Sequence, residues 1–202
     1  MDIAGSVRLD QTCLAGKHVR LEPASLDHAE AMHQAATPDT FGLFTKQPSP
    51  WTTNACHEYI RYLIDEPSTL PFSLFDAQTN ELIGGTSYCD IRPAHRGLEI
   101  GWTWITPNRR GTAVNPEMKL LLLAHAFETG IFEAGPAIRV MLKTHHENKH
   151  SQAAISKLGA TYEGTLRQHV IMPDGSFRDT VVYSILDSEW AGVKAGLLRR
   201  VA

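Results

Sequence analysis

One continuous stretch, residues 97–130, places a basic pair directly before the start of an expected helix. It reads GLEIGWTWITPNRRGTAVNPEMKLLLLAHAFETG, with Arg109 and Arg110 in the loop and Asn115–Pro116 as the expected helix start. Backbone N–H groups of such a loop and first turn point at one spot, and the helix dipole adds partial positive charge there. The stretch therefore predicts an anion site, although an ordinary capped helix explains the same spacing.

The loop matches neither of two common phosphate-binding sequences. It lacks the Gly-Lys-Ser/Thr ending of a P-loop and the GxGxxG of a Rossmann fold. An anion site outside these classes suggests a pyrophosphate ligand such as coenzyme A. The other side chains that could do chemistry are Glu99, in the strand before the loop, and the pair His145 and His146 after a later strand. No group of His, Cys and carboxylate residues has metal-ligand spacing, so no metal is expected.

Apolar periodicity and turn signals predict the elements that must position these residues. The expected strands are residues 18–22, 72–75, 82–91, 98–105, 138–143, 160–170 and 180–186. The expected helices are residues 26–36, 54–65, 116–130, 149–158 and 187–200, with an ordered loop over 37–53. A run of antiparallel strands followed by a strand–helix–strand crossover indicates a mixed α/β sheet.

Composition narrows the class of protein. The 202 residues are 43% hydrophobic and 20% charged, which predicts one globular domain over 18–202 after a loose N-terminal extension, 1–17. The net charge of −3 lacks the basic excess of a nucleic-acid binder. Neither a membrane-length apolar run nor a signal pattern occurs, so a soluble, cytoplasmic protein is expected. Three scattered cysteines, Cys13, Cys56 and Cys89, argue against a disulfide framework. They are expected to lie away from the motifs, which disfavours an acyl-cysteine route.

Residues 18–190 resemble the GNAT (Gcn5-related N-acetyltransferase) superfamily, and look most like its RimJ/RimL-like ribosomal-protein N-terminal acetyltransferase branch. The family signature Arg/Gln-x-x-Gly-x-Gly/Ala maps to residues 110–115, where Ala113 and Asn115 depart from the fourth and sixth positions. The segments EIGWTWI, NKHSQAAISKLGA and RDTVVYSILDSEW, in that order, also resemble this branch.

The resemblance implies a GNAT fold, in which a mostly antiparallel sheet of about seven strands is splayed where acetyl-CoA binds and is flanked by helices. It also implies which residues hold the donor. The backbone near the end of strand 98–105 would bind the pantetheine arm, the loop would bind the pyrophosphate, and Asn148 and Ser151 would lie near the arm and the thioester sulfur. The residues so assigned are Trp104, Ile105, Thr106, Arg109, Arg110, Gly111, Thr112, Ala113, Val114, Asn115, Asn148 and Ser151.

Glu99 is the candidate general base, because strand alternation puts it on one face with Gly101 and Thr103, opposite Leu98, Ile100, Trp102 and Trp104. Alternatively, Glu99 only forms an ion pair with an arginine such as Arg92 or Arg96. His145 and His146 are rival candidates for the base, and the simpler interpretation is that they are solvated histidines of a loop. Many family members have a tyrosine acid where this chain has Ile155, so Ser151 or a water molecule would serve.

The acceptor pocket is expected along the loop that follows the first helix. Phe44, Trp51 and Tyr88 are assigned as its walls, with core packing as the equally good explanation. The sequence thus predicts direct transfer of acetyl from acetyl-CoA to a primary amine, and favours a peptide or protein N-terminal α-amine as the acceptor. A small-molecule amine acceptor and a non-catalytic acyl-CoA-binding module are the alternatives, and a homodimer is left open.

Overall fold

The computed structural model describes residues 12–202, which form eight strands and five helices. The strands are β1 Leu14–Ala15, β2 Val19–Pro23, β3 Leu70–Asp76, β4 Leu82–Arg92, β5 Gly97–Ile105, β6 Arg139–His145, β7 Thr161–Ile171 and β8 Phe177–Leu186. The helices are α1 Ala29–Ala35, α2 Thr53–Asp65, α3 Val114–Glu128, α4 Lys149–Ser156 and α5 Asp187–Val201. No helix in this part of the chain is long and apolar enough to cross a membrane.

All eight strands form one sheet, in the order β1-β2-β3-β4-β5-β6-β8-β7. Neighbouring strands are antiparallel except β5 and β6, which are parallel. This arrangement confirms the mixed, mostly antiparallel sheet. The sheet has eight strands rather than about seven, because Leu14–Ala15 pairs with Leu21 and Arg20. Part of the predicted loose extension is therefore a sheet edge, and residues 1–11 lie outside the described residues.

The sheet opens between β5 and β6. The two strands pair at only three positions, Gly97–Glu99 against Arg139–Met141. From Ile100 to Ile105, β5 continues to pair with β4 while its other edge has no strand beside it. The result is a gap that starts next to Glu99 and continues to the end of β5.

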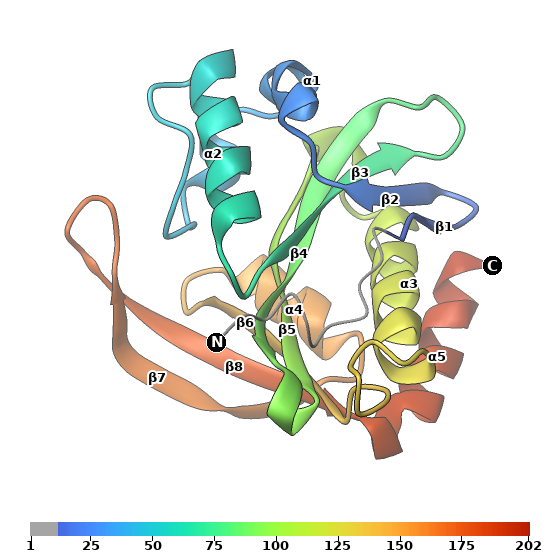
Figure 1. Cartoon of the computed structure of the whole chain (residues 1–202). Coiled ribbons are helices and arrows are strands. Elements are labelled where there is room, and N and C mark those ends of the chain that lie inside the picture. The colour runs from blue at the N-terminus through green and yellow to red at the C-terminus, as the bar shows by residue number, and fades with distance from the viewer. Residues whose placement is uncertain (1–11) are drawn as a thin grey trace.

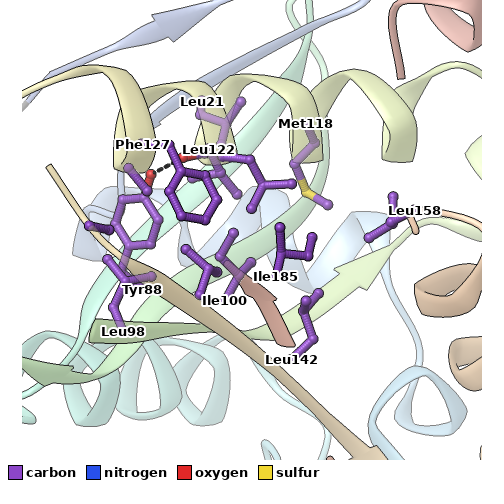
Figure 2. Packing of buried hydrophobic residues seen from close by; sticks show 14 of the residues in the cluster. Leu21, Tyr88, Leu98, Ile100, Met118, Leu122, Phe127, Leu142, Leu158 and Ile185 are labelled. Atoms are coloured by element: carbon purple, nitrogen blue, oxygen red, sulfur yellow. Dashed lines mark hydrogen bonds between the residues drawn. The ribbon is translucent and has the colours of Figure 1, made fainter. Parts of the chain in front are cut away.

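Helices cover the two faces of the sheet separately (Figure 1). Helices α1 and α2 lie together on one face, and α3 and α5 lie on the other, while the β7–β8 hairpin extends away from both pairs (Figure 1). The main core fills the space under α3, where Figure 2 shows Leu98 and Ile100 of the sheet packed with Leu122 of the helix. A second cluster, built around Phe41, lies under α1 and α2.

A bulge in β5 changes which residues face each core. Trp102 and Thr103 together oppose the single residue Thr86, and Trp102 has a φ of +52°. One extra residue inverts the direction of every later side chain in the strand. Trp102 and Trp104 therefore join the second cluster on the face of Glu99, whereas alternation alone wrongly placed them with Leu98 and Ile100.

Helix α3 begins at Val114, two residues earlier than expected. Its N-cap is Ala113, which makes no side-chain capping bond, so the prediction that Asn115 caps this helix is wrong. Pro116 fits within the first turn because backbone N–H groups there have no partner inside the helix. The Thr112 hydroxyl instead accepts a hydrogen bond from the N–H of Val114, at 3.3 Å.

Candidate active site

The loop between β5 and α3, residues 106–113, presents unpaired backbone donors. Within the described chain, no group accepts a hydrogen bond from the N–H of Gly111, Thr112 or Ala113. Gly111 has a φ of +75°, and a side chain built there would meet no atom within 4 Å. These donors lie at the positive end of a 15-residue helix. The loop therefore fits an anionic group such as a pyrophosphate.

A buried hydroxyl at the entrance of this loop also lacks a partner. Thr106 Oγ1 is buried and makes no hydrogen bond to a described residue. An orphaned polar atom of this kind is costly unless a ligand or water satisfies it. Thr106 directly follows Trp104 and Ile105, whose edge away from β4 has no strand beside it.

The two arginines of the loop are engaged differently. Arg109 forms an ion pair with Asp76 at 2.7 Å, so its charge is largely committed to the end of β3. Arg110 donates from Nε to the carbonyl oxygen of Ile105 at 3.0 Å and remains exposed. Arg110 therefore ties the loop to β5 and is the better placed of the two for a phosphate.

Glu99 lies at the closed end of the gap and is only 13% exposed at its side chain. Its carboxylate forms an ion pair with Lys143 of β6 at 2.8 Å, and Lys143 also reaches Asp90 at 3.4 Å. Burial lowers the pKa of Lys143, but the charges of Glu99 and Asp90 outweigh it, and the net pKa lies above the usual range. Glu99 therefore does form an ion pair, as the alternative explanation expected, but with a lysine rather than with Arg92 or Arg96. Arg92 pairs with Asp90, and Arg96 donates to the carbonyl oxygen of Pro136.

Helix α4 starts at the carboxyl end of β6, so it opens beside the same gap as α3. Asn148 caps it by accepting from the N–H of Ser151 at 2.9 Å. The hydroxyl of Ser151 makes no hydrogen bond to any described residue and is free to contact a ligand. Ile155, in the place of the family's tyrosine, is buried in the main core and offers no proton.

The two histidines after β6 hold the turn into α4. His145 is 6% exposed, and its Nδ1 accepts from the N–H of Glu147 at 3.0 Å. Its ring stacks on His146 at 4.6 Å, and His146 is bonded to the backbone of Asp179. Burial, followed by the charge of His146, lowers the pKa of His145. These contacts favour a structural role for the pair.

The predicted acceptor walls divide between the two faces of the sheet. Phe44 and Trp51 pack around Phe41 in the second cluster, on the same face as Glu99. Tyr88 does not join them. Its side chain is fully buried on the α3 face, where its hydroxyl donates to the carbonyl of Leu122 at 2.7 Å (Figure 2). Tyr88 is thus a core residue, and its assignment to the acceptor pocket is corrected.

Two residues of this site were not singled out from the sequence. Trp102 is half-buried in the bulge, in the part of β5 that does not pair with β6, and contacts Phe44 and Tyr62. Lys143 neutralises Glu99. The only sequence signal for Lys143 is a lysine at the end of an apolar strand, which is common at surfaces.

Comparison with known proteins places these features in a family. Residues 18–161 match the family described as an acetyltransferase (GNAT) domain. No curated protein matches the chain. A candidate acetyltransferase from T. thermophilus is 37% identical, with a TM-score of 0.86 over 94% of this chain and 97% of that one.

Two more distant structures share the fold. A GCN5-related N-acetyltransferase from Brucella melitensis is 24% identical, with a TM-score of 0.87 over 98% of this chain and 88% of that one. RimL, a ribosomal L7/L12 α-N-protein acetyltransferase solved with coenzyme A, is 19% identical, with a TM-score of 0.70 over 87% of this chain and 98% of that one.

Proposed function

The chain belongs to the acetyltransferase (GNAT) domain family, and from this premise we propose that it transfers acetyl from acetyl-CoA to the α-amino group of a peptide or protein N-terminus. The observation that carries the proposal is the gap between β5 and β6, which ends at the unpaired donors of residues 111–113. An extended arm with amide groups can bind the free edge of β5 while its pyrophosphate meets the start of α3.

Acetyl-CoA supplies the thioester in this reaction. The acceptor nitrogen bonds to the carbonyl carbon, the carbon–sulfur bond breaks, and the amine gives up one proton as the thiolate leaves. Glu99 lies on the face of Trp102 and Phe44, where it can take that proton directly or through water. A coenzyme A thiol has a pKa near ~8.5, by analogy with cysteine, so its thiolate leaves readily, and the Ser151 hydroxyl can donate a hydrogen bond to it.

Direct attack is favoured over an acyl-cysteine route, although one cysteine lies nearer than the sequence suggested. Cys89 of β4 pairs across the strands with Glu99, which corrects the expectation that the cysteines lie away from the motifs. Its thiol is buried, and burial, followed by the charge of Glu99, raises its pKa well above the usual range. A thiol that stays protonated is a poor nucleophile.

Amine chemistry supports an α-amine as the acceptor. An α-amine with a pKa near 7.7–8.0 is roughly 10% neutral at pH 7, whereas a lysine amine near 10.4 is neutral to only about 0.04%. A single carboxylate base that is already paired with Lys143 suits the more readily deprotonated amine. The net charge of −3 suits a basic peptide better than an anionic one. RimL, whose acceptor is an N-terminal amine, has the same fold.

Two matched basic peptides test the proposal with acetyl-CoA, one blocked at its N-terminus and one blocked at its lysines. We expect faster coenzyme A release with the peptide whose N-terminus is free. Faster release with the N-terminally blocked peptide would overturn the α-amine assignment. Release with neither peptide, but with a panel of small amines, would favour the small-molecule acceptor. Donor binding without release to any amine would indicate a binding module.

A further inference from the structure

Helix α3 carries a lysine on its buried side. Lys119 lies in the second turn, immediately before four leucines, and is only 5% exposed. Lysine is almost never fully buried in proteins unless it is paired. Lys119 therefore occupies a position that an apolar side chain would normally fill.

The Lys119 amine is attached to the bulge of β5. Its Nζ donates to Thr103 Oγ1 at 3.3 Å, and Thr103 Oγ1 lies 2.8 Å from Thr86 Oγ1 of β4. Both hydroxyls also reach the carbonyl oxygen of Gly101, at 3.3 Å and 3.4 Å. Thr103 directly follows Trp102, in the part of β5 that has separated from β6. The amine thus fixes the strand segment that lines the gap.

No carboxylate neutralises this amine. Among the described residues, none lies within 4 Å of Lys119 as an ion-pair partner. The carboxylate of Glu117, on the same helix, is already bonded to the backbone of residues 17–19. Burial lowers the pKa of Lys119 to about 7, and only the more distant groups of Cys89 and Glu99 oppose that shift. The amine can therefore gain or lose its proton near neutral pH.

We propose that Lys119 is a positioning residue of the acyl-transfer site, which in its protonated form holds Thr103 and the Trp102 bulge in place beside the acyl group. This inference rests on the proposed acetyl transfer. A positive charge behind the bulge also favours the negative charge that develops on the thioester oxygen during attack. Loss of the proton would weaken both effects, so the rate of transfer should fall as Lys119 is deprotonated.

Kinetics of four variants test this inference against the wild type. Lys119→Met removes the charge, Thr103→Val removes only its partner hydroxyl, and Thr103→Ser restores that hydroxyl. Lys194→Met, at a partly exposed lysine of α5 that pairs with Glu128, is the control. We expect Lys119→Met and Thr103→Val each to lower kcat by about tenfold or more at pH 7, with KM for acetyl-CoA within about threefold. Thr103→Ser and Lys194→Met should retain the wild-type kcat.

The pH profile and a double variant separate positioning from mere folding. The wild-type kcat should fall on the alkaline side, and that fall should be absent in Lys119→Met. The variant carrying both Lys119→Met and Thr103→Val should be no slower than Lys119→Met alone, because Lys119→Met already removes the interaction that Thr103→Val removes. A wild-type kcat in either single variant, or additive losses in the double variant, would overturn the inference.

A binding measurement needs no turnover. Calorimetry of acetyl-CoA binding near pH 8, in two buffers of different ionisation enthalpy, reports protons taken up on binding. We expect uptake by the wild type, because the negative charge of the bound donor favours the protonated form of the buried Lys119 amine, and none by Lys119→Met. Equal uptake by both proteins contradicts the inference. A wild type that binds acetyl-CoA but acetylates no amine contradicts the proposed function instead.

Discussion

In the proposed mechanism the carboxylate of Glu99 has two roles that compete, because it pairs with Lys143 and must also accept a proton from the acceptor amine. The ion pair at 2.8 Å occupies one of its oxygens. An incoming amine must therefore draw Glu99 away from Lys143 or approach its second oxygen. This competition explains why a nucleophile that is already partly neutral suits the site.

Glu99→Gln tests the role of Glu99 as proton acceptor by replacing a single carboxylate oxygen. Glutamine keeps an acceptor for Lys143 but cannot take a proton, so we expect kcat to fall by about 10²–10⁴-fold with little change in acetyl-CoA affinity. Glu128→Gln, at the far end of α3, also alters a lysine-paired carboxylate and should leave kcat unchanged. A loss below tenfold, together with a large loss in His145→Ala or His146→Ala, would move the base to the histidines.

The same reasoning predicts how Lys119 affects stability. Its pKa is about 7 when folded and about 10.4 when unfolded, so between these values the unfolded chain binds more protons. Stability should therefore rise with pH from about 7 to 10, and below pH 7 the buried charge opposes folding fully. Lys119→Met should raise Tm at pH 7, and this gain should shrink toward pH 10. A difference in Tm that does not vary with pH would contradict the assigned pKa.

Among the elements, the start of α3 carries the most specific prediction. Gly111→Asp places a negative charge among the unpaired N–H groups, so it should abolish the increase in Tm that acetyl-CoA gives the wild type. Aspartate tolerates the φ of +75° better than most residues, and no atom lies within 4 Å of the new Cβ, so the fold should persist. Gly130→Asp, just beyond the opposite end of α3, should keep the ligand-induced increase. Unchanged acetyl-CoA affinity in Gly111→Asp would reject the loop as the phosphate site.

Strand β5 shows what the sequence could and could not predict about this site. The strand was expected at 98–105 and lies at Gly97–Ile105, because its apolar residues alternate clearly. The predicted face for the Trp102 side chain was wrong, because the extra residue of the bulge inverts the alternation. The residue with the positive φ is a tryptophan, not a glycine, so the sequence does not signal the bulge. Helix α3 starts and ends two residues earlier than expected, and its N-cap is Ala113 rather than Asn115.

The ion pairs inside the site could not be predicted from local sequence patterns, because their partners are distant in the sequence. Lys143 and Glu99 are brought together only by the parallel pairing of β5 with β6. Asp76, which forms an ion pair with Arg109, lies at the end of β3, and β4 separates β3 from β5 in the sheet. Lys119 could have been singled out from the sequence. It directly precedes four leucines, in a helix with little solvent-exposed surface, where a charged residue is unusual.

At the scale of the whole molecule, α3 links the candidate donor loop to the far edge of the sheet. Glu117, in its first turn, accepts hydrogen bonds from the backbone N–H groups of Lys17, His18 and Val19 at 2.9, 2.6 and 2.8 Å. One carboxylate thus fixes the entry of the chain into β2 and, at the same time, the orientation of the turn that follows residues 111–113.

Gly16→Ala should break this link. The new Cβ would lie 2.5 Å from Cδ of Glu117, so the carboxylate must move away from its three donors. We expect the free energy of unfolding to fall by about 2 kcal/mol or more, since hydrogen bonds to charged groups contribute about 1.5–3 kcal/mol each. Gly42→Ala, whose Cβ meets its nearest atom at 3.7 Å, should change it by less than about 0.5 kcal/mol. Equal unfolding midpoints in urea for the two variants would refute this account.

The gap between β5 and β6 also provides a way to detect, in solution, whether a ligand is bound in it. Backbone amides of residues 100–105 that point away from β4 have no strand to protect them, although the sheet around them is well paired. Such amides exchange their hydrogens with solvent deuterium quickly, while paired neighbours do so only when the structure opens. A molecule lying in the gap would slow that exchange, so these few amides form a built-in reporter that needs no label and no chemical turnover.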